Sequence, residues 1–257
     1  MSPTLPWRLA GVIMAVPVLG FGFLQVTGTL AHQETTTVTH VPAAGIDTLE
    51  VHNGAGGVRV IGTDNTDTIT VTAHVSNGLR STGHTMTTEG HRLVLTGTCP
   101  VIANTWCSVG YTVEVPHAVA LDLHAGDGIR AADIDGPIHV STDQGSITLQ
   151  RVHGPVDLST DQGSINVTGL AGGRVRAHSD QGSVNLSFRG SPRAVDAQTD
   201  QGSVEIVLPH EDNVSFATDT HTDQGSVSDQ INQDPNSERT IRAHSDQGDV
   251  TLRYGQS

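Results

Sequence analysis

Thr142-Asp143-Gln144-Gly145-Ser146-Ile147 is the first copy of a six-residue phrase that recurs through the C-terminal half of the chain. Each later copy has Thr or Ser, then Asp-Gln-Gly, then Ser or Asp, and then Ile or Val; the copies span 160–165, 179–184, 199–204, 222–227 and 245–250. Successive copies begin 18, 19, 20, 23 and 23 residues apart. A phrase that returns at a step near 20 residues is typical of stacked repeats. We therefore predict an all-β, single-stranded parallel solenoid (β-helix), right-handed, in which each copy is one turn.

Apolar residues alternate with polar ones on both sides of the phrase. Ile147 and Leu149 follow the first copy, and Ile138 and Val140 precede it. A period of two places such side chains on one face of a strand, so each turn should contain two short strands with inward apolar faces. The fifth copy departs from this pattern because Asp229 stands at the second inward position. We expect the polar stretch 229–238 that follows to form a loop at the rim.

Two residues of the phrase suit a sharp corner between strands. Glycine adopts positive φ without a steric penalty, and an Asp carboxylate can accept hydrogen bonds from nearby backbone amides. Turns stacked about 4.8 Å apart should align these residues into an aspartate column and a glycine column. The two columns would contain Asp143, Asp161, Asp180, Asp200, Asp223 and Asp246, and Gly145, Gly163, Gly182, Gly202, Gly225 and Gly248.

The aspartate column is also a candidate cation site, because Ca²⁺ binds carboxylate and carbonyl oxygens. The copies, however, lack the period and the Gly-Gly pair of the nonapeptide found in calcium-binding coils. The expected role of the corner is therefore structural, with weak cation binding as the alternative, and we predict no dedicated metal site and no cofactor.

The chain is strongly acidic, with 27 acidic residues, 13 basic residues and a net charge of −14. All of its basic residues are arginine. This balance argues against binding to nucleic acid, whose phosphates require a basic surface. It also argues against docking on anionic lipid headgroups.

The N-terminus has the pattern of a membrane anchor. Arg8 precedes an uncharged segment from Leu9 to Ala31, which is long enough to cross about 30 Å of hydrocarbon. A basic residue on the leading side predicts that the N-terminus lies inside the cell and the rest outside. The alternative is a signal peptide cleaved after Ala31, which would release a secreted protein. We thus divide the chain into an anchor at 1–31, a Thr-rich linker at 32–46 and one continuous solenoid domain at 47–257.

Cys99 and Cys107 are the only two cysteines, and both lie in the part expected outside the cell. In an oxidising compartment this spacing favours a disulfide that closes a short loop. Two free buried thiols are the alternative. A metal site built on these cysteines is disfavoured because no histidine lies nearby in the sequence.

Histidines stand two residues before the aspartate in three copies, at His178, His221 and His244. The last two should be neighbours in the stack and could form a chance metal pair. The string from His178 through Ser179 to Asp180 resembles a catalytic triad in composition, but adjacent residues of a strand face opposite sides of the sheet. Aromatic residues, which would support a sugar substrate, are scarce. We therefore predict that the protein is not an enzyme and has no catalytic residues.

Several features together resemble one bacterial family: the membrane segment, the early glycine-rich copy at 53–62, the passage from Cys99 to Pro116 and the glycine-centred repeats. Over nearly its whole length the chain is similar to the DUF4097 family of adhesin-like envelope proteins. The family's corner often reads Thr-Gly-Ser-Gly-Asp-Val, whereas five copies here read Asp-Gln-Gly-Ser and only 248–250 keep the Gly-Asp-Val ending. The resemblance supplies no catalytic residue.

The resemblance implies a non-enzymatic, adhesin-like interaction module that is held at the cell membrane and binds an unknown surface or envelope partner. The alternative is a regulatory ectodomain that senses the state of the envelope through a membrane partner.

Overall fold

The computed structural model describes residues 33–77, 82–99, 107–171 and 173–255. These residues form 21 β-strands in two sheets and contain no helix. In particular, the described part of the chain has no helix long and apolar enough to span a membrane. The predicted anchor at 1–31 lies outside the described residues.

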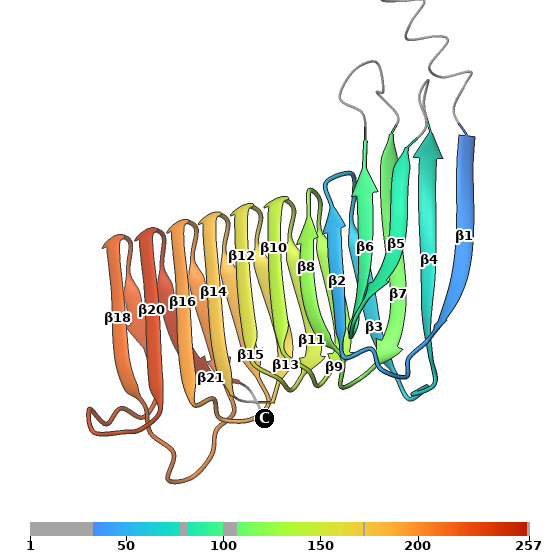
Figure 1. The fold of residues 1–257 in the computed structure, drawn as a ribbon. Coiled ribbons are helices and arrows are strands. Elements are labelled where there is room, and N and C mark those ends of the chain that lie inside the picture. The colour runs from blue at the N-terminus through green and yellow to red at the C-terminus, as the bar shows by residue number, and fades with distance from the viewer. Residues whose placement is uncertain (1–32, 78–81, 100–106, 172, 256–257) are drawn as a thin grey trace, which may run out of the picture.

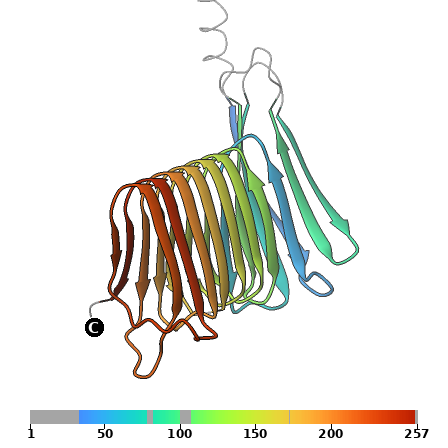
Figure 2. The ribbon, with the colours of Figure 1, turned by 90° about the vertical axis from the view of Figure 1, so that its left-hand side faces the viewer.

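The two sheets face each other, and their strands are joined by corners along one side of the molecule (Figures 1 and 2). Sheet A, which has 11 strands, runs in the order β1 (Gln33–Pro42), β4 (Thr68–Asn77), β7 (Ser108–Pro116), β3 (Val58–Thr63), β9 (Ile129–Ile134), β11 (Ile147–Val152), β13 (Ile165–Leu170), β15 (Val184–Phe188), β17 (Val204–Leu208), β21 (Val250–Tyr254), β19 (Val227–Asp229). Sheet B, which has 10 strands, runs in the order β18 (Ala217–Gln224), β20 (Thr240–Gln247), β16 (Ala194–Gln201), β14 (Arg174–Gln181), β12 (Val156–Gln162), β10 (Ile138–Gln144), β8 (Ala120–Ala125), β2 (Thr48–Asn53), β6 (Arg92–Thr98), β5 (Gly83–Glu89).

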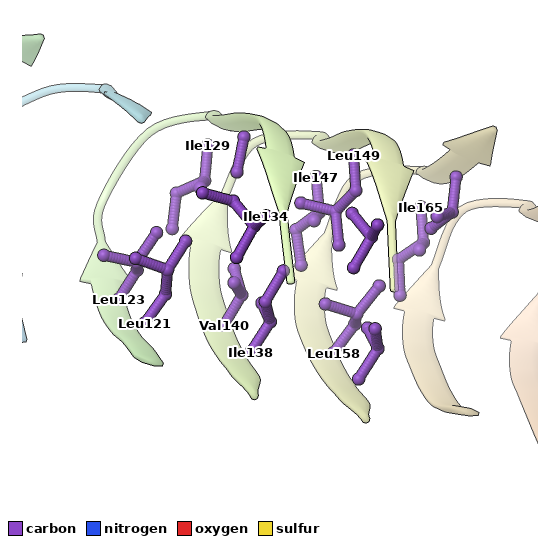
Figure 3. Packing of buried hydrophobic residues seen from close by; sticks show 14 of the residues in the cluster. Leu121, Leu123, Ile129, Ile134, Ile138, Val140, Ile147, Leu149, Leu158 and Ile165 are labelled. Carbon is purple, nitrogen blue, oxygen red and sulfur yellow. The ribbon is translucent and has the colours of Figure 1, made fainter. Parts of the chain in front are cut away.

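Each repeat forms one rung, with a sheet B strand, a corner and a sheet A strand. The predicted inward residues are buried: Ile138 and Val140 on β10, and Ile147 and Leu149 on β11, are at most 2% exposed. Such side chains form a column between the sheets, in which the apolar residues of one rung contact those of the next (Figure 3). Neighbouring rungs pair in parallel, as in β10 with β12 and β11 with β13. The all-β prediction and the parallel pairing of the repeats are confirmed.

The order of the rungs in space differs from their order in the chain at the C-terminal end. β20 pairs with β16 on one side and with β18 on the other. β21 likewise lies between β17 and β19. The sixth copy of the phrase therefore packs on the fourth, and the fifth copy is the terminal rung.

This position accounts for the irregular fifth copy. Thr218 and Thr220 of β18 stand opposite the apolar Ile241 and Ala243 of β20, and Asp229 of β19 stands opposite Leu252. Polar residues at inward positions are tolerated here because no further rung covers them, and a polar outer face is what a capping repeat requires. The stretch after Asp229 forms no strand, as predicted, although Phe216 makes a single bridge to Gln233 within it.

The N-terminal end departs from the predicted parallel coil. β4 pairs antiparallel with β7, and β5 pairs antiparallel with β6. The segment 32–46, predicted to be a linker, contains β1, which pairs antiparallel with β4 over all ten of its residues. Its Thr and Val residues suit a strand, and β1 extends sheet A by pairing with the backbone edge of β4. The chain is thus a parallel stack with an antiparallel extension at one end.

Candidate functional site

The corner phrase forms the predicted columns, and the glycine column is required by close packing between rungs. A Cβ atom on Gly182 would overlap the carbonyl oxygen of Gly163 on the neighbouring rung. All six corner glycines meet neighbouring backbone in this way. The predicted positive φ occurs at Gly182, Gly202 and Gly248 only. Close contact between rungs therefore explains why the corner residue is glycine in all six copies. In three copies the positive φ is an additional reason.

The Thr or Ser at the first position of the phrase, rather than the Asp, completes the hydrogen bonding of the corner. Thr199 Oγ1 donates to the Gly182 carbonyl oxygen at 2.7 Å, and Ser179 Oγ donates to that of Gly163 at 2.9 Å. Both side chains are at most 1% exposed. Sequence reasoning missed this role, although the hydroxyl residue present in every copy was a signal for it.

The aspartate column lies on the outer surface. Within the described residues no corner carboxylate accepts a hydrogen bond from a backbone amide, so the predicted capping role is wrong. Three of the carboxylates lie against a histidine instead: Asp223 and Asp246 accept hydrogen bonds from His221 and His244 at 2.9 Å each, and Asp180 Oδ1 lies 3.0 Å from His178 Nε2. No three corner carboxylates of the described chain approach within 4.8 Å of one another. The geometry therefore offers no evident calcium cage.

The histidines that precede these aspartates do not form a catalytic arrangement. The rings of His221 and His244 stack with centroids 5.3 Å apart, so the two residues are neighbours in the stack as predicted. In the string from His178 to Asp180, however, Ser179 points into the core while the other two side chains face outward. A triad cannot form from groups on opposite faces of one strand.

The predicted disulfide between Cys99 and Cys107 is present. It joins the end of β6 to the start of β7, at the side of the molecule where the repeats have their corners. The bond thus links a strand of sheet B to a strand of sheet A.

A groove of about 840 Å³ runs across the outer face of sheet B and is lined by charged, small and branched apolar residues. It crosses the strands from β2 to β18, which at about 4.8 Å per strand is a path of about 34 Å. Its lining contains no Phe, Tyr or Trp. Small outward residues contributed by successive strands line one side, among them Ala120, Pro137, Pro155, Ala194 and Ala217.

A column of charged side chains lies along this groove. These residues occupy equivalent register positions on neighbouring strands of sheet B, in the order Asp122, His139, Asp157, Arg176, Asp196, Arg242 and Asp219. From Asp157 onward, acid and arginine alternate. We call this set the charge column.

Some neighbouring members of the charge column form solvent-exposed ion pairs. Arg242 Nε lies 3.3 Å from Asp219 Oδ2, and Arg176 Nε lies 4.0 Å from Asp196 Oδ2. Arg242, Arg176 and Asp219 are more than half exposed. Exposed pairs of this kind contribute little to stability, so their groups are available to an incoming ligand.

Glu50 on β2 stands opposite Asp122, next to the end of the charge column. The hydrogen bond from His52 holds the pKa of the Glu50 carboxyl below its usual range, with a further contribution from Arg92. This carboxylate is therefore charged at neutral pH, which extends the acidic character of this end of the column.

Sequence reasoning missed the charge column, although its signal was present. In each repeat the residue between the two inward residues of the first strand is charged or histidine, as in Val195-Asp196-Ala197 and Ile241-Arg242-Ala243. Only the spatial order of the strands converts these residues into a column of alternating sign.

The sequence profile of the Toastrack DUF4097 family matches residues 17–253. The chain belongs to this family. The match covers nearly the whole sequence, including the membrane-anchor candidate from residue 17 and all six copies of the phrase. No curated protein matches the chain.

Three of the solved structures that resemble the chain are described in terms of adhesion or lipid binding. A candidate cell adhesion protein from Clostridium sporogenes is 10% identical, with a TM-score of 0.45, over 87% of this chain and 100% of that one. A candidate adhesin from Bacteroides fragilis is 11% identical, with a TM-score of 0.39, over 86% and 97%. A candidate lipid binding protein from Parabacteroides distasonis is 10% identical, with a TM-score of 0.27, over 86% and 97%. Likeness at this level carries no inference about a ligand.

Proposed function

We propose that this DUF4097 protein is a non-enzymatic, adhesin-like binding module, held outside the cell membrane by the segment 1–31, which uses the groove on sheet B to bind an extended polypeptide segment with cationic side chains. The observation that carries the proposal is the groove with its charge column. A path of about 34 Å across parallel strands suits an extended ligand better than a compact small molecule.

The charges of the groove favour a cationic ligand. Four of the seven members of the charge column are aspartates and two are arginines; Arg174 also lines the groove, so aspartates outnumber arginines there by four to three. The net charge of −14 adds a negative field around the whole chain. Such a field attracts cationic partners and speeds their association.

The absence of Phe, Tyr and Trp from the groove lining disfavours a polysaccharide. Sugar rings commonly pack on aromatic side chains, whose apolar faces and polar edges suit them. A polypeptide requires no such platform, because its charged side chains can pair with the column.

The test is binding of the full chain to an array of short peptides that range from acidic to basic, with an array of surface polysaccharides as the second arm. We expect binding to basic peptides that weakens as salt is added, because exposed ion pairs are screened. Asp157→Asn should weaken this binding and Arg176→Gln should strengthen it. Glu205→Gln, which removes an acid paired with Arg253 on the opposite sheet, is the matched control. Binding to polysaccharide alone, or equal effects of all three variants, would contradict the proposal.

The location has its own test. We expect the protein to remain with the membrane after a salt wash and to expose its C-terminus outside the cell. A mature N-terminus at His32, together with release into the medium, would show the cleaved alternative. Co-isolation from intact envelopes with a membrane-bound regulator would instead favour the sensing ectodomain.

A further inference from the structure

Three potential metal ligands converge on the outer face of sheet B, next to the groove. Asp122 and His124 lie two residues apart on β8 and project from the same face. His139 on β10 stands opposite Asp122 in the parallel register. One ligand atom from each of the three side chains lies within 4.8 Å of the other two, which is true of no other group of His, Cys, Asp or Glu in the described parts of the chain.

The His124 ring is oriented by neighbouring side chains. Its Nδ1 is hydrogen-bonded to Ser141 Oγ at 2.6 Å, which leaves Nε2 facing Asp122 Oδ1 at 3.1 Å. The His52 ring stacks on it with a centroid separation of 5.2 Å and an interplanar angle of 5°. A hydrogen bond at the remote ring nitrogen is the usual arrangement of a metal-ligating histidine, because it fixes the ring and its tautomer.

An independent observation is the state of the Asp122 carboxylate. Its Oδ1 atom is inaccessible to solvent and has no hydrogen-bond partner in the described structure. His124 Nε2 therefore lies close enough to this oxygen for an ion pair, but the two groups are not aligned for a hydrogen bond. A buried carboxylate oxygen without a partner is costly, and a bound cation would satisfy it.

We propose that Asp122, His124 and His139 bind a divalent transition-metal ion of the Zn²⁺ class. Two imidazoles and one carboxylate are a donor set that Zn²⁺ accepts, whereas Ca²⁺ prefers six to eight oxygens. Bonds of about 2.0–2.2 Å require the side chains to close slightly around the ion. The side chains of Asp122 and His124 are each 40% exposed and that of His139 is 51% exposed, so at least one coordination position stays open to the groove.

Other histidine–aspartate pairs on the same sheet provide internal controls. His178 with Asp180 and His244 with Asp246 have the same close contact, at 3.0 and 2.9 Å. Neither pair belongs to a three-ligand group. They should therefore bind Zn²⁺ much more weakly, although their local chemistry is the same.

The test is titration of the full chain with Zn²⁺, after treatment with a chelator and without an added polyhistidine tag. We expect one tight site per chain and no comparable binding of Ca²⁺ or Mg²⁺. Loss of an outer-shell partner alone costs about 10- to 100-fold in metal affinity, so His139→Gln and Asp122→Asn should weaken binding at least that much. His178→Gln and His244→Gln are the matched controls and should leave the tight site intact.

The role of Ser141 gives a second, finer readout. Ser141→Ala should weaken Zn²⁺ binding by about tenfold without changing its stoichiometry, and Ser159→Ala, one rung along, should have no effect. Co²⁺ bound by the wild type should show the intense visible absorption of a four-coordinate ion, and His139→Gln should lose it. Unchanged Zn²⁺ affinity in His139→Gln, or loss of the tight site in His244→Gln, would overturn the proposal. These measurements involve no peptide ligand, so they are independent of the proposed function.

Discussion

The Ser245 hydroxyl donates a hydrogen bond to the carbonyl oxygen of Gly202 at 2.7 Å, although 43 residues separate the two in the chain. The copy between them packs on the far side, where Thr222 Oγ1 donates to the Gly248 carbonyl oxygen at 2.8 Å. The last copy of the phrase is therefore held between the fourth and the fifth. The same hydroxyl-to-carbonyl contact joins every one of these rungs, so the corners form a continuous internal ladder.

The first prediction concerns this ladder. Thr199→Val keeps the shape of the buried side chain but removes the donor to the Gly182 carbonyl oxygen. An unsatisfied buried acceptor costs about 1–3 kcal/mol, and we expect a loss of unfolding free energy in that range by urea denaturation. Thr199→Ser, which restores the hydroxyl found in other copies, is the control. Equal midpoints for the two variants would show that the hydrogen bond contributes nothing.

The second prediction concerns the packing of corner glycines. Gly182→Val forces side-chain atoms against the backbone of Gly163, and overpacking of this kind costs about 1–3 kcal/mol or more. Ser183→Ala, in the next position, removes only a partly exposed hydroxyl that accepts a bond from the Ser203 amide at 3.2 Å. We expect a far lower melting temperature for Gly182→Val. Similar melting temperatures would mean that rungs can separate at the corner without penalty.

The third prediction tests the aspartate column. Asp180 lies between Asp161 and Asp200 on neighbouring strands, and its Oδ1 lies 3.0 Å from His178 Nε2. Since Asn keeps the shape of the exposed Asp side chain and removes like-charge repulsion, Asp180→Asn should change the unfolding free energy by no more than about 0.5 kcal/mol. In protein already freed of transition metals, added calcium should leave the melting temperature of both forms unchanged. A calcium-dependent rise in the wild type that disappears in Asp180→Asn would instead establish a calcium site.

The fourth prediction concerns the disulfide. Replacing Cys99 and Cys107 by Ser should cost about 2–4 kcal/mol, since the closed loop restricts the unfolded chain. Because the bond joins β6 to β7, hydrogen exchange should increase first in these strands and last in β14 and β16 near the middle of the stack. Labelling of both thiols in the unreduced, denatured protein would refute the bond itself.

The fifth prediction tests the terminal rung as a cap. Thr218→Val with Thr220→Val gives β18 the apolar inward face of an interior rung. We expect the double variant to self-associate end to end, because an open edge with an apolar face promotes strand pairing between molecules. Sedimentation velocity measures the association. Thr148→Val with Thr251→Val, two outward positions on sheet A within the stack, is the isosteric control; identical sedimentation of all forms would show that the polar inward face has no protective role.

The sequence determined the structure within each rung. Alternation with a period of two decides which side chains are buried, as for Ile147 and Leu149, because successive residues of a strand face opposite sides. The phrase itself predicts a corner, and the short spacing of Cys99 and Cys107 predicts their bond. All of these features depend on contacts between residues close in the chain, so a local pattern is enough to specify them.

Only the tertiary structure decided which rung packs on which. The six copies of the phrase are nearly identical, so the corner chemistry of the sixth fits the fourth as well as the fifth, and local pattern cannot choose between them. The choice depends on the polar inward residues of the fifth copy, such as Thr220 and Asp229, which stack favourably only at an end. That exchange of order places Arg242 between Asp196 and Asp219 and so creates the alternating charge column. In the same way, His139 meets Asp122 and His124 only because β10 pairs with β8 in one register, which neighbouring sequence does not specify.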